Sequence, residues 1–258
     1  MIKFFQKAGL FSFASFLMKT RLSKCWVPKY IENNHIDMSE FEGMEFNSFA
    51  EFFGRKRENI PFDMRKNVLA SPCDSLLSVF EITEDMNIPM KGSHYRFEDI
   101  IPNKKTAEKY NGGMCLVFRL QASDYHHFCA FDNLELKETH YIPGLLHSVQ
   151  PIAIESCPVY RLNRRWWSVI ETENFGEVLQ VEIGAMMVGG VTFARDKGSF
   201  TKGEEFGNFE LCGSTIVLIV SKEFKEKFRF YDKFLKAESE EVAIKIGEGL
   251  GEINSQTN

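Results

Sequence analysis

Proline and long hydrophobic runs are both scarce in this 258-residue chain. It has only 8 Pro against 25 Phe, and 44% of its residues are hydrophobic and 26% charged. An intrinsically disordered or low-complexity protein is therefore a poor interpretation. There is no internal repeat and no linker rich in Pro or Ser. The length suits one large domain or two small ones, so we expect a folded protein with a sizeable core.

Acidic residues are absent from the first 31 positions. This segment contains six cations: Lys3, Lys7, Lys19, Arg21, Lys24 and Lys29. Its formal charge is +6, which leaves −11 for the remainder of a chain whose total is −5. A basic N-terminal segment on an otherwise acidic chain favours contact between that segment and an anionic surface.

The same N-terminal segment has no hydrophobic run long enough to cross a membrane. Its uncharged stretch, residues 8–18, spans 11 residues, whereas a spanning helix needs about 20. No small-x-small cleavage site follows, and cations close the run, so a signal peptide is disfavoured. The Phe and Lys content is typical of an interfacial amphipathic helix. A core-packed helix with a solvated basic face is the alternative.

Metal-binding and disulfide patterns are also missing. The six cysteines form no C-x-x-C pair and no His-spaced cluster: Cys25, Cys73, Cys115, Cys129, Cys157 and Cys212. We therefore expect neither a metal site nor a disulfide framework. A reducing, cytoplasmic compartment fits this cysteine usage.

Hydrophobic periodicity divides the chain into two parts. Residues 1–57 have helical spacing, and Asn47-Ser48 ahead of Glu51 is typical of a helix cap. Beyond residue 66, turn residues separate short runs predicted as strands: 68–70, 76–82, 115–120, 146–149, 152–154, 166–170, 178–193 and 215–220. Helical spacing returns at 222–237 and at 240–248. We predict an α+β fold: a β-rich body, 58–258, with N-terminal amphipathic helices, 1–57, and a C-terminal helical segment.

Three short motifs carry reactive groups, but each is weak alone. Asp74 follows Ser71-Pro72-Cys73, where an Asp is commonly a turn former. The string from Asp124 to Cys129 holds a carboxylate, two imidazoles and a thiol, which supply acid/base and nucleophilic groups. Adjacent histidines are usually surface residues. Gly213-Ser214 would by itself indicate a turn or bulge before an apolar strand.

The ordered combination of segments resembles the phosphatidylserine decarboxylases. The matching segments follow the family's order along nearly the whole chain: 36–40, 46–55, Ser71-Pro72-Cys73-Asp74, 91–95, 118–120, Asp124-Tyr125-His126, 148–151, 163–165, 181–189, 202–207 and Cys212-Gly213-Ser214-Thr215. The resemblance implies a self-cleaving enzyme whose covalent pyruvoyl group derives from Ser214. In this chemistry the serine Oγ attacks the Gly213 carbonyl, and β-elimination from the resulting ester leads to pyruvoyl. No dissociable cofactor is then needed.

The resemblance also implies roles for other residues. Asp74 matches an aspartate that activates the serine, although Ser75 replaces the family's following glycine. His126 matches a histidine assigned to decarboxylation, as the acid that protonates the substrate carbon. The family's triad histidine falls on Cys129, and a neutral thiol is a poorer base than imidazole. His147, His127 and the Cys129 thiol, in that order, are the candidates for the missing base.

The function implied by the resemblance is decarboxylation of phosphatidylserine to phosphatidylethanolamine at the cytoplasmic face of an anionic membrane, to which the protein binds peripherally. The cleaved chains, 1–213 and 214–258, are expected to stay together, a homodimer is possible, and no nucleic-acid partner is expected. Four cations are available for the glycerophosphate: Arg119, Arg164, Arg165 and Lys202. Two alternatives stay open: a soluble pyruvoyl amino-acid decarboxylase, and an uncleaved, non-catalytic relative.

Overall fold

An eight-stranded antiparallel sheet dominates the computed structural model, which describes residues 15–90, 93–150, 153–154, 158–185, 190–211 and 214–254. The strands follow one another across the sheet in this order: β11 (Gly198–Phe200), β7 (Leu134–Ile142), β8 (Arg165–Thr172), β9 (Gly176–Gly184), β13 (Ser214–Val220), β5 (Met114–Leu120), β2 (Ser75–Glu81) and β15 (Val242–Ile244). Every neighbouring pair is antiparallel.

Three smaller sheets accompany the large one. Their strand orders are β10 (Val191–Phe193), β12 (Glu205–Phe209), β6 (His127–Cys129); then β1 (Val68–Ala70), β16 (Gly249–Ile253), β14 (Phe228–Phe230); then β3 (Asn87–Met90), β4 (Ser93–Arg96). The main hydrophobic core joins one face of the large sheet to both three-stranded sheets, for example through Phe128, Phe209 and Leu250. A second core covers the opposite face.

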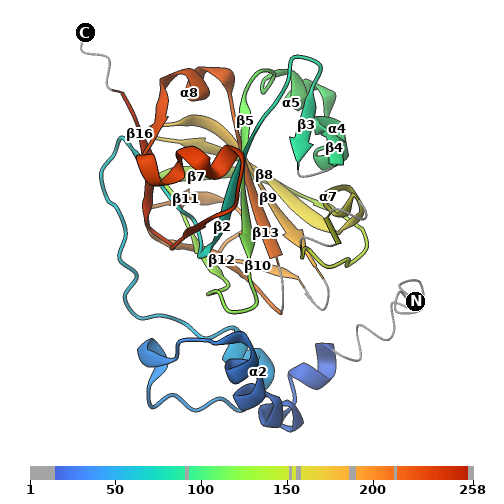
Figure 1. Cartoon of the computed structure of the whole chain (residues 1–258), viewed down its shortest axis with the longest axis vertical. Helices are drawn as coiled ribbons and strands as arrows, with labels where there is room; N and C mark the ends of the chain where they lie inside the picture. Colours follow the sequence, from blue (N-terminus) through green and yellow to red (C-terminus); the bar gives the residue numbers. More distant parts are fainter. Residues whose placement is uncertain are drawn as a thin grey trace.

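Short helices lie around this β-rich body. They are η2 (Arg21–Trp26), α2 (Val27–Asn34), η3 (Ser39–Phe41), α3 (Phe49–Phe53), α4 (Phe97–Ile100), α5 (Lys104–Glu108), α7 (Val159–Leu162), α8 (Lys222–Lys227) and η4 (Asp232–Glu238). The N-terminal helices gather at one end of the body and α8 lies at the opposite end (Figure 1). Ser48 caps α3 as the sequence predicts, because its side chain accepts a hydrogen bond from the Glu51 N–H.

The strand β13 runs through the middle of the large sheet. All seven of its residues are buried, as expected for a run of aliphatic, mostly β-branched side chains. Ile216 and Leu218 belong to the main core, whereas Val217 and Ile219 belong to the second core. Because side chains alternate along a strand, Ser214 shares the main-core face with Ile216.

The predicted α+β, β-rich fold is confirmed, with local differences. Residues 146–149 contain no strand, and Leu145 forms one isolated bridge with Asn163. Residues 153–154 are helical, and the run at 178–193 divides into β9 and β10. The expected helix at 222–237 is interrupted by β14. The expected helix at 240–248 is wrong, because Val242–Ile244 forms the edge strand β15, which pairs with β2.

The predicted interfacial helix falls mainly on residues 1–14, which lie outside the described residues. Within the described part, the N-terminal segment forms short helices that end with α3. No helix found there is long and apolar enough to span a membrane.

Candidate active site around Ser214

Ser214 occupies the first position of the central strand β13. It pairs with Gly184 on β9 and with Leu120 on β5. The residue is fully buried, and its Oγ has no hydrogen-bond partner among the described residues. The preceding residue, Gly213, lies outside the described residues. A buried hydroxyl normally has a partner, so this orphaned Oγ marks a place where chemistry is expected.

Asp74 lies immediately before β2, at the same end of the sheet as Ser214. Its Oδ1 accepts a hydrogen bond from the Ile246 N–H at 2.8 Å. Its Oδ2 lies 3.1 Å from Arg57 Nη1 and 3.3 Å from Lys245 Nζ. These three donors fix a carboxylate that is only 1% exposed. The strand between β13 and β2 is β5, so Asp74 and Ser214 are separated by two strand spacings, about 10 Å.

His126 ends the loop that follows β5, and it is a neutral acceptor in this structure. Nδ1 lies 2.8 Å from the Asp124 carbonyl oxygen, which can only accept, so Nδ1 carries the proton. Nε2 is buried and has no partner among the described residues. Burial lowers the pKa of His126 to about 3, although the Asp124 hydrogen bond and the Asp74 charge oppose this shift. To give a proton at Nε2, the ring must first take one.

Cys129 lies on β6 beside the loop that carries Asp74. Its N–H donates to the Pro72 carbonyl at 2.8 Å. Its side chain is buried in a hydrophobic cluster with Phe41, Tyr125 and Ile246. Burial, with a smaller contribution from the Glu205 charge, raises the pKa of the Cys129 thiol to about 12. Very little thiolate is therefore available near neutral pH.

The other two candidate bases differ in their surroundings. Both ring nitrogens of His127 are occupied: Nδ1 lies 3.0 Å from Glu205 Oε1, and Nε2 lies 3.1 Å from the Gly54 carbonyl oxygen. His147 is half-buried in the segment between β7 and α7. His147 is therefore more accessible than His127, which is buried and contacts Glu205 and Gly54.

Asn163 ties the His147 segment to the strand beside Ser214. Its Oδ1 accepts from the His147 N–H, and its Nδ2 donates to the carbonyls of His147 and Gly184, each at 2.8 Å. Gly184 is the register partner of Ser214. Asn163 stands in a family-like segment of the sequence but has no role implied there, and Arg57, which contacts Asp74, carries no signal in the sequence. A fully buried asparagine is visible only in the structure.

All four cations considered for the glycerophosphate have partners within the protein. Arg119 makes a two-pronged contact with Glu241, at 2.8 and 2.7 Å. Arg165 donates to backbone carbonyls, among them that of Ile100. Lys202 donates to the carbonyls of Arg65 and Val68. Arg164 lies beside the site, because a Cβ built on Gly184 would be 3.3 Å from its Cγ.

Among the described residues, no group of three or more His, Cys, Asp or Glu side chains could hold a metal ion. Cys25, Cys73, Cys115 and Cys129 are free thiols. The reactive groups described at this end of the sheet include a buried serine, a fixed carboxylate and a neutral imidazole.

The chain is similar to known proteins over most of its length. A family model described as phosphatidylserine decarboxylase matches residues 46–252. The chain is 41% identical to phosphatidylserine decarboxylase proenzyme 2 of Clostridium acetobutylicum, covering 88% of this chain and 78% of that protein. It is 36% identical to the proenzyme of Clostridium tetani, covering 90% and 80%, and 34% identical to that of Clostridium botulinum strain Langeland, covering 97% and 88%. The chain belongs to the phosphatidylserine decarboxylase family.

Proposed function

We propose that this protein cleaves itself between Gly213 and Ser214 and then decarboxylates phosphatidylserine to phosphatidylethanolamine. The observation that carries the proposal is the orphaned, fully buried Oγ of Ser214 at the start of the central strand. The name proenzyme, given to the Clostridium relatives, supports self-cleavage as the step that makes the enzyme active.

The cofactor proposed is a pyruvoyl group made from Ser214. Oγ attacks the Gly213 carbonyl and an ester replaces the amide; elimination and hydrolysis then leave pyruvoyl at the new chain end, with release of ammonia. This ketone supplies the electron sink for loss of CO₂. His126, whose buried Nε2 has no partner among the described residues, is proposed to take up and return a proton there, and Arg164 beside Gly184 is the cation proposed to meet the lipid phosphate.

The two products of self-cleavage are proposed to remain one protein. Residues 214–220 form a strand between β9 and β5, and β15 and β16 pair with β2 and β1. Arg119 and Glu241, which would belong to different chains after cleavage, are joined by a charge-assisted double hydrogen bond. Removing one peptide bond leaves all these contacts in place.

The N-terminal segment is proposed to bind an anionic membrane peripherally, at its cytoplasmic face. Phe16, Leu22 and Trp26 expose 64%, 77% and 47% of their surface there, among basic residues such as Lys19 and Lys24. Apolar side chains interspersed with cations are typical of interfacial helices.

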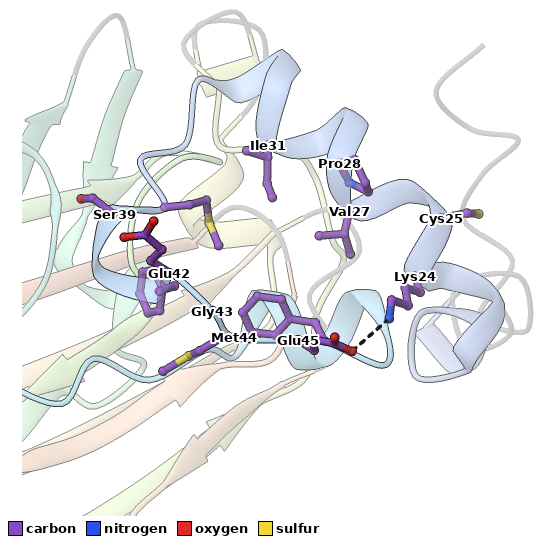
Figure 2. Close-up of a pocket in the computed structure, with 13 residues that line it drawn as sticks. Lys24, Cys25, Val27, Pro28, Ile31, Ser39, Glu42, Gly43, Met44 and Glu45 are labelled. Atoms are coloured by element: carbon purple, nitrogen blue, oxygen red, sulfur yellow. Dashed lines mark ion pairs between the residues drawn. The ribbon is translucent and has the colours of Figure 1, made fainter.

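A cavity of about 870 Å³ opens within the same segment (Figure 2). Val27, Ile31 and Phe41 are among its lining residues, and the Lys24–Glu45 ion pair, at 3.9 Å, lies at one side. This apolar lining belongs to the same segment as the exposed Leu22 and Trp26, and it supports the proposal that the segment contacts lipid.

The test is formation of phosphatidylethanolamine from phosphatidylserine in vesicles by the purified full chain. We expect product with the wild type and none with Ser214→Ala. Free serine supplied instead of the lipid separates the alternatives: product from free serine but not from the lipid would favour the soluble amino-acid decarboxylase. No product from either, with an intact chain, would favour the non-catalytic relative.

A further inference from the structure

Glu182 is a buried acid to which the family resemblance assigns no role. It lies on β9, opposite Ile216 on β13 and Trp166 on β8. Its side chain is fully buried. Glutamate is almost never fully buried unless paired, so its presence inside the central sheet requires a reason.

The register of the sheet places Glu182 beside Ser214. Ser214 is opposite Gly184, two residues along β9 from Glu182. Since side chains alternate, Glu182, Gly184, Ser214 and Ile216 share the main-core face. Diagonal neighbours of this kind are about 7–8 Å apart at Cα, within reach of a long side chain. Gly184 has no side chain, and the space in front of it is bordered by Arg164 and Leu146, whose Cγ and Cδ2 lie 3.3 and 3.6 Å from where a Cβ would stand.

The hydrogen bonds leave one carboxyl oxygen unused. Glu182 Oε1 accepts from Gln180 Nε2 at 2.6 Å. Glu182 Oε2 and Ser214 Oγ are both buried without a partner among the described residues. Two orphaned polar atoms on diagonal positions of one sheet face would satisfy one another if the Glu182 carboxyl turned from Gln180 toward Ser214.

The ionisation of Glu182 suits proton exchange near neutral pH. Burial raises its pKa to about 8, and the hydrogen bond from Gln180 only partly offsets this. The pKa of Cys129 is about 12 and that of His126 about 3. A general acid/base works best when its pKa lies near the working pH, which among these three groups is true of Glu182 alone.

We propose that Glu182 exchanges a proton with Ser214 during self-cleavage, in place of the family's triad histidine. As Oγ bonds to the Gly213 carbonyl carbon, the Glu182 carboxylate accepts the Oγ proton. As the carbon–nitrogen bond breaks, the same proton passes to the Ser214 nitrogen. One C–O bond forms, one C–N bond breaks and nothing is oxidised. This inference rests on the proposed self-cleavage.

Other titratable or charged groups border this part of the sheet and bear on its pH dependence. Arg164 precedes β8 and packs against Gly184. His126 lies in the loop after β5, and His147 is linked to Gly184 through Asn163. The opposing strands β6 and β12 contribute Phe128 and Phe209 to the main core, and neither of these titrates.

The experiment follows cleavage by denaturing gel after translation, from pH 5.5 to 9.5. In the wild type we expect the rate to rise with pH, centred near pH 8, because the carboxylate is the accepting form. Glu182→Gln keeps the size and one oxygen acceptor but cannot take the proton, so cleavage should fall at least about 100-fold and lose this rise. Glu177→Gln, on the same strand, is the matched control and should match the wild type.

Melting curves of Glu182→Gln establish that it folds. As a second variant, Glu182→Asp withdraws the carboxyl by one methylene, and we expect slower cleavage that still rises with pH. The proposal is overturned if Glu182→Gln cleaves at the wild-type rate. It is also overturned if the wild-type rate rises with a midpoint near pH 6.5, as a histidine base requires. So does His147→Ala stopping cleavage while Glu182→Gln matures normally. A wild-type chain that never cleaves refutes instead the proposed function.

Discussion

The ring of Phe53, the last residue of α3, lies 4.2 Å from the ring of His126, centroid to centroid. The N-terminal segment thereby covers the histidine and helps to bury it. The same segment reaches the site through Arg57, which contacts Asp74, and through the Gly54 carbonyl, which accepts from His127. The N-terminal segment, which carries the proposed membrane contact, therefore also shapes the surroundings of the catalytic candidates.

Burial of His126 predicts a specific dependence of stability on pH. Its pKa is lowered to about 3 in the folded protein, against about 6.5 in an unfolded chain. The unfolded state therefore binds more protons below pH 6.5, and stability falls as pH drops from 6.5 toward 3, by about 1.4 kcal/mol per unit. Urea unfolding of Ser214→Ala, a single chain, measures this. Adding His126→Gln should flatten the slope, and an unchanged slope would show that His126 is not the titrating group.

Asp74 is expected to be essential for cleavage, whereas Lys245, its exposed ion-pair partner, is not. Asp74→Asn removes the carboxylate that holds Arg57, Lys245 and the Ile246 N–H at this end of the sheet, and a small misplacement of the site should lower the cleavage rate by roughly 100-fold or more. Lys245→Ala is the matched control. Its side chain is 70% exposed, and Ile246 and Arg57 still hold Asp74. We expect it to cleave within about threefold of the wild type. Equal rates for the two variants, followed by gel, would contradict this.

The Cys129 thiol is not expected to act as the base. With its pKa raised to about 12, almost no thiolate exists at pH 7. Cys129→Ser should therefore mature within about threefold of the wild-type rate, because the un-ionised thiol supplies no base that the substitution would remove. Densitometry of the two chains over time is sufficient. If this substitution alone abolished maturation, the thiol would have to be the proton acceptor.

Membrane binding is expected to depend on the exposed apolar residues of the N-terminal segment. Leu22 is 77% exposed, and Leu22→Asp both removes apolar area and adds repulsion from anionic lipid. Sedimentation with phosphatidylglycerol vesicles should show binding weakened by about tenfold or more. Leu235, 60% exposed on η4, provides the control Leu235→Asp, which should bind like the wild type. Equal losses in both variants would point to a general charge effect.

The sequence predicts the elements whose signal is local. The apolar run 215–220 is a strand and Ser48 is a cap, as expected, because side-chain type and hydrogen bonding to near neighbours decide both. Val242–Ile244 was expected to be helical but forms a strand because the free edge of β2 accepts it. That contact joins residues distant in sequence, and no local pattern reveals it.

The same distinction applies to the site. Ser214, Asp74 and His126 stand in motifs that identify a family, so they could be named in advance. Arg57 and Asn163 act through single contacts with residues far along the chain. Glu182 did leave a signal, an acid within the apolar segment 181–187. Its meaning depends on the register that sets it diagonal to Ser214, which only the paired strands provide.

The central claim is that the chain cuts itself at Ser214, and intact mass measurement of the purified protein tests it most directly. For a 29.8 kDa chain, cleavage between residues 213 and 214 predicts two fragments of about 24.6 and about 5.2 kDa, the smaller with a blocked, pyruvoyl-bearing end. Ser214→Ala should give one full-length mass. A wild-type protein that keeps its full-length mass after prolonged incubation would contradict the account.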